Sequence, residues 1–292
     1  MSNVEANGIT IEYDNFGERS ARPLLLIMGL GAQMVLWDEE LCRMLADRGH
    51  YVVRFDNRDV GLSSKIDGVG DIVEAFREPM RGEKIETPYT LDDMADDAVG
   101  LLDALGIEEA HICGASMGGM IAQTIAIRHP SRVRSLISIM SAAGNFGISP
   151  ADLGALQSLV KPLPEKREDY IEYAVDACRV FAGKGFRFDE QGVREIMARS
   201  YDRCFYPQGT VRQLMAVLSH GSRKEALASV KTPTLVIHGS DDPLVPVEWG
   251  KDTAKAVPGA ELLIIEGMGH EMPVEVWPRL VEAISEHTEK AG

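Results

Sequence analysis

Short apolar runs alternate with longer amphipathic stretches along most of the chain. Apolar runs of four to eight residues occupy 24–28, 51–55, 110–113, 133–140, 234–238 and 261–265, and helical patterns occupy 34–48, 91–105 and 119–128. Short strands separated by helices predict a mostly parallel sheet with helices on both faces, and therefore an α/β fold. Residues 8–13 alternate apolar and polar positions instead, which predicts an antiparallel edge strand with one face in water.

The alternation stops between residues 145 and 230, where strand signals vanish. Apolar side chains there follow the spacing of helical faces, as in Ile171, Val175, Cys178 and Phe181, and in Val193, Met197, Tyr201 and Cys204. We expect residues 145–230 to form a helical cap over the carboxyl ends of the strands, and residues 1–144 and 231–292 to form the core. The alternative is that these helices simply extend the core.

Composition narrows the class of protein. The 292 residues are 45% hydrophobic and 26% charged, with a net charge of −15, so a nucleic-acid partner or an anionic membrane is not expected. The start of the chain lacks a basic and apolar leader, and the longest apolar tract, 24–37, is interrupted by glycines and too short to span a bilayer. The cytoplasm is therefore the expected location. The cysteines at 42, 113, 178 and 204 lack metal-ligand spacing, and without an export signal they are expected to be reduced thiols. The oligomeric state cannot be predicted.

Candidate chemistry begins with the sequence Gly-Ala-Ser-Met-Gly at residues 114–118, which joins an apolar run to a helical pattern. A serine at a sharp strand-to-helix turn, with glycine two residues away on either side, is held out of the sheet as a nucleophile. Ser116 is the predicted nucleophile. The alternative is a glycine-rich turn whose serine only caps the helix.

A serine nucleophile needs a base and an acid that orients the base. His270 follows the run at 261–265 in a glycine-rich loop, and Asp242 follows the run at 234–238. Loops after parallel strands converge at one sheet edge, so we expect Ser116, Asp242 and His270 to meet. Asp241 and Glu266 are alternative acids. The other histidines that end elements, His129 and His238, are interpreted as structural.

The transition state also needs hydrogen-bond donors for its oxyanion. We assign these to the backbone amides of Met117 and Leu30, because Met117 starts the helix after the nucleophile and Leu30 lies in a glycine-rich loop after a strand. An apolar substrate pocket is expected, with Gly29, Trp37, Phe146 and Met215 among its residues. Residues 29–31 could also begin a dinucleotide fingerprint, but Met34 occupies the place of its third glycine. No metal or cofactor is expected.

With these motifs in place, the whole chain resembles the α/β-hydrolase superfamily. Residues 56–63 look like the loop after the fourth strand in that family, and Gly-Met-Gly-His at 267–270 looks like its histidine loop. Met28 and Asp59 depart from the His and Gly that many members have. Together these features look most like a bacterial esterase group that includes aclacinomycin methyl esterases. The resemblance implies a mostly parallel eight-stranded sheet, helices on both faces and a helical cap.

The leading hypothesis is a serine carboxylesterase that hydrolyses small to medium esters through an acyl-enzyme intermediate. The same residues could serve a methyl esterase acting on a polyketide-type substrate, or a hydrolase of carbon–carbon bonds in vinylogous diketones. A third hypothesis is a ligand-binding module without catalysis. The expected partner is a small-molecule ester.

Overall fold

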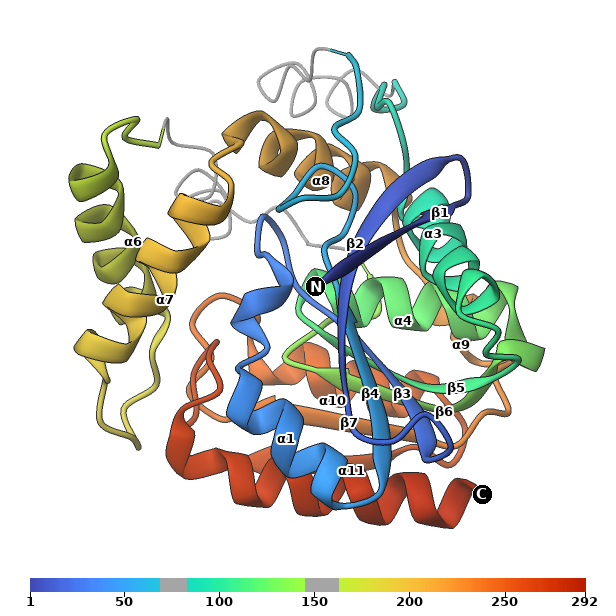
Figure 1. Ribbon diagram of the computed structural model, residues 1–292. Helices are drawn as coiled ribbons and strands as arrows, with labels where there is room; N and C mark the ends of the chain where they lie inside the picture. The colour runs from blue at the N-terminus through green and yellow to red at the C-terminus, as the bar shows by residue number, and fades with distance from the viewer. Residues whose placement is uncertain (69–82, 145–162) are drawn as a thin grey trace.

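An eight-stranded sheet forms the centre of the computed structural model, which describes residues 1–68, 83–144 and 163–292 (Figure 1). The strands are β1 (Ser2–Ala6), β2 (Ile9–Phe16), β3 (Arg22–Ile27), β4 (His50–Phe55), β5 (Ala110–Ala115), β6 (Val133–Ile139), β7 (Thr234–Gly239) and β8 (Glu261–Ile265). Their order in the sheet is β1-β2-β4-β3-β5-β6-β7-β8. Strands β3 to β8 are parallel, whereas β2 is antiparallel to both of its neighbours. The expected mostly parallel, eight-stranded α/β sheet is therefore confirmed.

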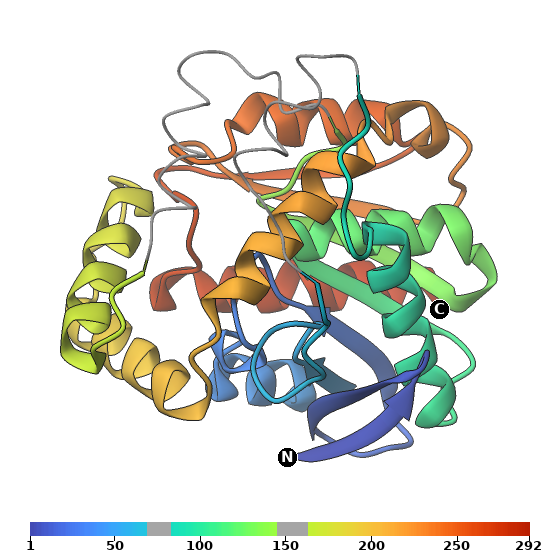
Figure 2. The ribbon, with the colours of Figure 1, turned by 90° about the horizontal axis from the view of Figure 1, so that it is seen from above.

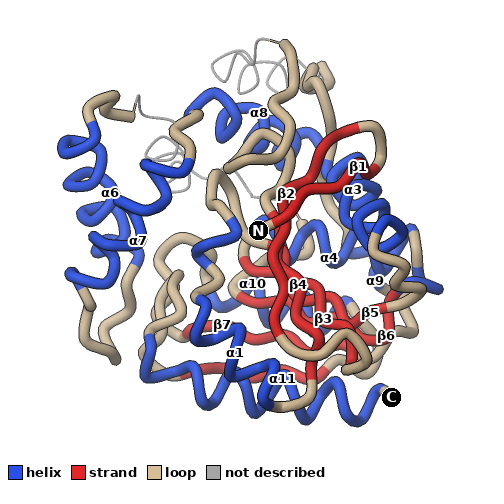
Figure 3. Tube along the Cα trace, viewed as in Figure 1, coloured by secondary structure: helices blue, strands red, loops and turns tan. Residues whose placement is uncertain are grey.

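Helices cover both faces of the sheet, as the tube in Figure 3 shows. One face packs against α3 (Leu91–Ala104), α4 (Met117–Arg128) and α10 (Val247–Ala256), and the other against α1 (Glu39–Asp47) and α11 (Trp277–Ala291). Short 3-10 turns occur at Met34–Leu36, Pro130–Arg132 and Val274–Val276. Within the described ranges, no helix has the length and apolar character needed to cross a membrane.

The core consists of two hydrophobic clusters, one on each face of the sheet. Strand β3 contributes to both, because side chains alternate between faces along a strand. Leu25 and Ile27 join the cluster under α3 and α4, and Leu24 and Leu26 join the cluster under α1 and α11. A continuous apolar strand is the expected signature of a sheet that is buried on both sides.

Two sequence predictions about the N-terminal part need correction. The edge strand is β1 rather than the strand predicted at 8–13, because β1 folds back on β2 through a tight turn at Asn7 and Gly8, which have φ of 48° and 78°. The helix predicted over 34–48 is interrupted, and α1 begins at Glu39 after Asp38, whose side chain accepts a hydrogen bond from the Glu40 N–H. An aspartate in that position is a favourable helix start.

The described part of the chain between β6 and β7 is helical. It contains α6 (Arg167–Phe181), α7 (Glu190–Arg203), α8 (Pro207–His220) and α9 (Lys224–Leu227). Helices α6 and α7 pack against each other and stand beside the sheet, as Figure 2 shows, whereas Ala216 and Val217 of α8 and Leu227 of α9 join a core cluster. The segment thus has an outer pair of helices and an inner part that extends the core.

The junction of β5 and α4 is packed too closely for any side chain at its glycines. A Cβ atom on Gly114 would lie 2.0 Å from the carbonyl oxygen of Gly118, and a Cβ on Gly118 would lie 2.1 Å from that of Ile27 at the end of β3. Real contacts are never this short, so backbone would have to move. Glycine at these positions lets α4 start directly against the sheet.

We predict that Gly118→Ala lowers the free energy of unfolding by at least about 2 kcal/mol, because the new methyl group overlaps the β3 backbone. Urea denaturation measures the loss. Gly259→Ala is the control: Gly259 has a φ of 76° but nothing within 4 Å of its would-be Cβ, so only the backbone cost of about 1 kcal/mol applies. An equal loss in both variants would contradict the steric account.

Candidate active site

Ser116 lies between β5 and α4 and has a backbone conformation that residues other than glycine rarely adopt. Its φ is 56° and its ψ is −122°. Hydrogen bonds hold it there: its N–H donates to the Ile139 carbonyl at 2.9 Å, and its carbonyl accepts from the Ser141 hydroxyl at 2.7 Å and from the N–H groups of Gly119 and Met120. Strain that is held by surrounding bonds is typical of functional sites. The predicted turn is therefore present, with the serine at its apex.

The three residues expected to meet do so at the carboxyl ends of β5, β7 and β8. His270 Nε2 lies 3.0 Å from Ser116 Oγ, and His270 Nδ1 lies 2.8 Å from Asp242 Oδ2. Since a carboxylate only accepts hydrogen bonds, the Nδ1 atom carries the proton. Nε2 is then free to accept the serine proton, which is the geometry that nucleophile activation requires.

The Asp242 carboxylate is buried and hydrogen-bonded at both oxygens. Oδ1 accepts from the backbone N–H groups of Leu244 at 2.9 Å and Val245 at 2.7 Å, while Oδ2 faces His270. Burial raises the pKa of Asp242, but hydrogen bonds from His238, His270 and Val245 outweigh it, and the pKa is lowered to about 2. The carboxyl group is therefore ionised over the whole neutral range.

His238 is a contact of Asp242 that the sequence interpretation missed. Its Nε2 lies 2.8 Å from the Val245 carbonyl and 3.4 Å from Asp242 Oδ2, with the side chain fully buried. Because both neighbours are acceptors, Nε2 carries the proton. The spacing His238 to Asp242 across the turn after β7 was the available signal. The structure places His238 against the candidate acid, a contact that its interpretation as a structural residue did not include.

Hydrogen bonds join the loop that carries His270 to the end of α6 and to the connection between α6 and α7. The His270 N–H donates to the Phe181 carbonyl at 2.8 Å, and the Gly185 N–H donates to the Gly267 carbonyl at 2.9 Å. The Glu271 carboxylate accepts from the N–H groups of Gly183, at 3.1 Å and 3.2 Å, and of Gly269 at 3.3 Å. Residues of the segment between β6 and β7 therefore fix the backbone of the candidate base, a role that no local pattern indicated.

Met117 and the loop that carries Leu30, the two expected oxyanion donors, adjoin Ser116. Met117 is the first residue of α4, and a Cβ on Gly29 would lie 3.1 Å from the Ser116 Cβ, which places the loop after β3 against the serine. Within residues 1–68, 83–144 and 163–292, the amides of Leu30 and Met117 have no hydrogen-bond acceptor. Both N–H groups therefore remain candidate donors to a substrate oxygen.

The residues expected around the substrate have different placements. Trp37 is 1% exposed and packs in the core cluster beside α1. Met215 is buried on α8 and belongs to neither core cluster. Phe146 lies outside the described residues.

Asp241, the alternative acid next to Asp242, makes a local turn contact. Its side chain accepts a hydrogen bond from the Ser240 hydroxyl at 2.8 Å.

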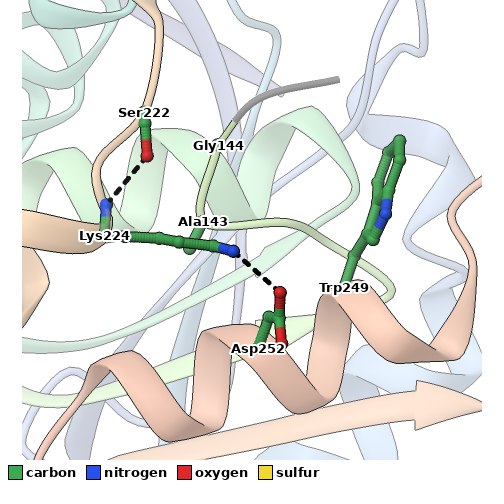
Figure 4. Close-up of a pocket in the computed structure, with 6 residues that line it drawn as sticks. All are labelled: Ala143, Gly144, Ser222, Lys224, Trp249 and Asp252. Atoms are coloured by element: carbon green, nitrogen blue, oxygen red, sulfur yellow. Dashed lines mark hydrogen bonds and ion pairs between the residues drawn. The ribbon is translucent and has the colours of Figure 1, made fainter. Parts of the chain in front are cut away.

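Figure 4 shows a pocket whose lining contains none of the three converging side chains. It is lined by Ala143, Gly144, Ser222, Lys224, Trp249 and Asp252. Lys224 Nζ and Asp252 Oδ2 lie 2.7 Å apart and neutralise each other, so we assign no chemistry to this pocket. Across the three described ranges, no group of three metal-ligating side chains lies close enough to hold an ion. The four cysteines are free thiols, two of them buried.

The fold and these residues define an α/β hydrolase, and comparison with known proteins agrees. The family model described as the alpha/beta hydrolase fold matches residues 22–275. The chain therefore belongs to the α/β-hydrolase fold family, which confirms the resemblance seen in the sequence.

The chain is also similar to individual proteins of this family. Rhodomycin D methylesterase DauP of Streptomyces sp. (strain C5) is 30% identical over 99% of this chain and 98% of its own length. The 2-hydroxymuconate semialdehyde hydrolase of Pseudomonas sp. (strain CF600) is 30% identical over 70% of this chain and 71% of its own. A solved thermophilic esterase from Thermogutta terrifontis is 23% identical with a TM-score of 0.75, covering all of this chain and 99% of its own, and supports the fold.

The lowered pKa of Asp242 predicts how stability changes with pH. A carboxyl group whose pKa is lower in the folded state stabilises it above the unfolded pKa, and that stability is lost as pH falls toward the folded value. With values of 3.8 and about 2, wild type loses about 1 kcal/mol from this group between pH 5 and pH 3. Asp242→Asn has no carboxyl group at this position, so its free energy of unfolding should fall by less over this pH range. Urea denaturation of both proteins measures the difference, and equal dependence on pH would contradict the prediction.

Proposed function

We propose that the protein is a serine carboxylesterase in which Ser116 is the nucleophile, His270 the general base and Asp242 the residue that orients and stabilises the imidazolium. The observation that carries this proposal is the continuous chain of contacts from Asp242 Oδ2 to His270 Nδ1 at 2.8 Å and from His270 Nε2 to Ser116 Oγ at 3.0 Å. The methylesterase relatives support ester hydrolysis as its reaction.

Acylation follows from these contacts. His270 Nε2 removes the proton of Ser116 as Oγ attacks the ester carbonyl carbon, and the carbonyl oxygen becomes an oxyanion. The N–H groups of Leu30 and Met117 donate to that oxygen, and the N-terminus of α4 favours its negative charge. When the intermediate collapses, the bond to the alcohol oxygen breaks. His270 returns the proton to the alcohol, leaving an acyl group on Ser116.

Deacylation repeats the same steps with water. His270 removes a proton from water, the resulting hydroxide attacks the acyl carbon, and the carboxylic acid leaves as Ser116 regains its proton. The Asp242 carboxylate is ionised throughout because its pKa is lowered by its hydrogen bonds. Its negative charge stabilises the imidazolium that forms in each half of the reaction.

The second candidate function is removal of a methyl ester from a polyketide-type substrate. Two rhodomycin D methylesterases, each 30% identical over at least 97% of this chain, favour it. The third is cleavage of a carbon–carbon bond in a vinylogous diketone, favoured by the 2-hydroxymuconate semialdehyde hydrolases. All three reactions use the same serine, histidine and aspartate.

The remaining assignments are also proposals. We propose that residues 145–230 act as a cap that shapes the substrate pocket, with Gly29 and Met215 near the substrate. The buried placement of Trp37 does not support it as a pocket residue. We propose a small-molecule ester as the partner and the cytoplasm as the location, which the free cysteines favour.

We predict that Ser116→Ala lowers kcat for p-nitrophenyl esters by about 10⁴-fold or more, because the nucleophile is lost. Ser229→Ala, at a serine whose hydroxyl only donates to the Ala226 carbonyl, is the control and retains wild-type activity. Mass spectrometry after treatment with an organophosphate locates the adduct on Ser116. Undiminished turnover by Ser116→Ala would sink the nucleophile assignment.

The substrate class is tested by comparing kcat/KM for three substrates: p-nitrophenyl esters of increasing acyl length, a methyl ester of a polycyclic aromatic acid and a vinylogous diketone. We expect the better ester to exceed the diketone by at least about 100-fold, because the site discriminates through pocket contacts to one leaving group. A methyl ester preferred over every p-nitrophenyl ester identifies the second candidate. A preferred diketone would replace esterase function with carbon–carbon bond hydrolysis.

A further inference from the structure

Gln213 of α8 connects the loop after β3 to the loop after β4. Its side chain is fully buried. Its Oε1 accepts from the Gly31 N–H at 2.8 Å, and its Nε2 donates to the Arg58 carbonyl at 2.8 Å. One carboxamide therefore satisfies a donor on one loop and an acceptor on the other. Gly31 is the residue after Leu30, so the contact lies one peptide away from the proposed oxyanion donor.

Helix α8 cannot shift easily along the core, because its start is fixed by charge and by close packing. The Arg212 guanidinium binds both oxygens of Asp59, at 2.8 Å and 2.9 Å, and donates to the Tyr206 hydroxyl at 2.8 Å. A Cβ on Gly209 would lie 1.9 Å from the Asp59 carbonyl oxygen. The register of α8, and with it the position of Gln213, is thereby set against the core.

Gly31, which Gln213 binds, has a backbone conformation that favours glycine. Its φ is 65°, and a Cβ there would lie 2.6 Å from the Thr210 hydroxyl oxygen on α8. In such a turn, the N–H groups of neighbouring residues point in different directions. The Gly31 N–H points to Gln213, while the Leu30 N–H has no acceptor among the described residues.

Other bonds hold the two ends of the same loop. Asn57 Nδ2 donates to the Met28 carbonyl at 3.0 Å, and the Met34 N–H donates to Asp56 Oδ1 at 2.8 Å. These contacts come from the core. Among the residues that the structure describes, Gln213 of α8 is the side-chain acceptor for a backbone amide between Met28 and Met34.

We propose that Gln213 is a positioning residue for the oxyanion hole: by binding the Gly31 N–H, it fixes the peptide geometry that leaves the Leu30 N–H directed at the substrate oxygen. This inference rests on the proposed esterase function. Oxyanion donors act through fixed geometry, so a displacement of about 1 Å is enough to cost up to 100-fold in rate. The helix that bears Met215 would thus also assemble part of the catalytic centre.

The test is Gln213→Met, which keeps the length of the side chain and removes its hydrogen bonds. We expect kcat for a p-nitrophenyl ester to fall by about 10- to 100-fold with KM changed by less than about 2-fold, because the lost contact acts on the transition state. Affinity for a trifluoromethyl ketone, which forms a tetrahedral oxyanion adduct with a serine, falls by the same factor. Affinity for the product carboxylate stays at the wild-type value.

Three further variants make the result decisive. Gln191→Met is the matched control, because Gln191 lies on the exposed side of α7 and bonds only to Glu195; it retains wild-type kinetics. Gln213→Glu keeps an acceptor for Gly31, and its protonated second oxygen can donate to the Arg58 carbonyl, so this variant recovers most of the lost kcat at a pH where the buried carboxyl is protonated. Gln213→Asn, whose shorter side chain no longer reaches Gly31, gives the same readout should the methionine variant not fold.

A wild-type kcat and wild-type ketone affinity in Gln213→Met or Gln213→Asn would overturn the positioning role. In that case Ser116→Ala would still be inactive, and the proposed function would stand. If Ser116→Ala were active, the function itself would fail regardless of Gln213.

Discussion

The left-handed backbone of Ser116 is the constraint on which the site depends. A serine at φ of 56° between a strand and a helix projects its hydroxyl from the end of the sheet, but the conformation is strained. It persists because Gly114 and Gly118 allow β5, α4 and β3 to approach within distances that exclude a Cβ atom. The same approach places Gly29 against the serine and the first amide of α4 beside it. The proposed nucleophile and the proposed oxyanion donors are therefore positioned by one packing arrangement.

The segment between β6 and β7 binds two loops of the core near Ser116. The turn between α6 and α7 binds the backbone of His270, and α8 binds the loop that bears Leu30. Two loops of the core are thus held by helices that are remote from them in sequence. Asp59 is one anchor of this arrangement. Its φ of 69° is in a region that favours glycine, and its carboxylate binds Arg212 on α8.

Much of this arrangement could be predicted from the sequence, because strand-end loops of a parallel sheet converge whatever their separation along the chain. That rule correctly brought Ser116, Asp242 and His270 together. Local patterns also held a signal for β1, since Asn7-Gly8 favours a tight hairpin turn. The contacts of Glu271 and Gln213 were not predictable, because they depend on how a distant connection folds back or on the register of a helix against distant loops. The spacing of His238 and Asp242 did hold a signal for their contact. Trp37 was predicted to line the substrate pocket and is buried in the core cluster beside α1. An aromatic residue near a strand end packs into the core as readily as into a pocket.

The central claim is that three side chains from different strand ends work as one unit, and kinetics of combined variants test it most directly. We would measure kcat for an activated ester with Ser116→Ala, His270→Ala and the double variant. When residues act as a unit, removing one of them already abolishes the effect of the other. The kcat of the double variant should therefore lie within a few-fold of that of the slower single variant. Losses that multiply in the double variant would show that the two residues act independently and would contradict the account.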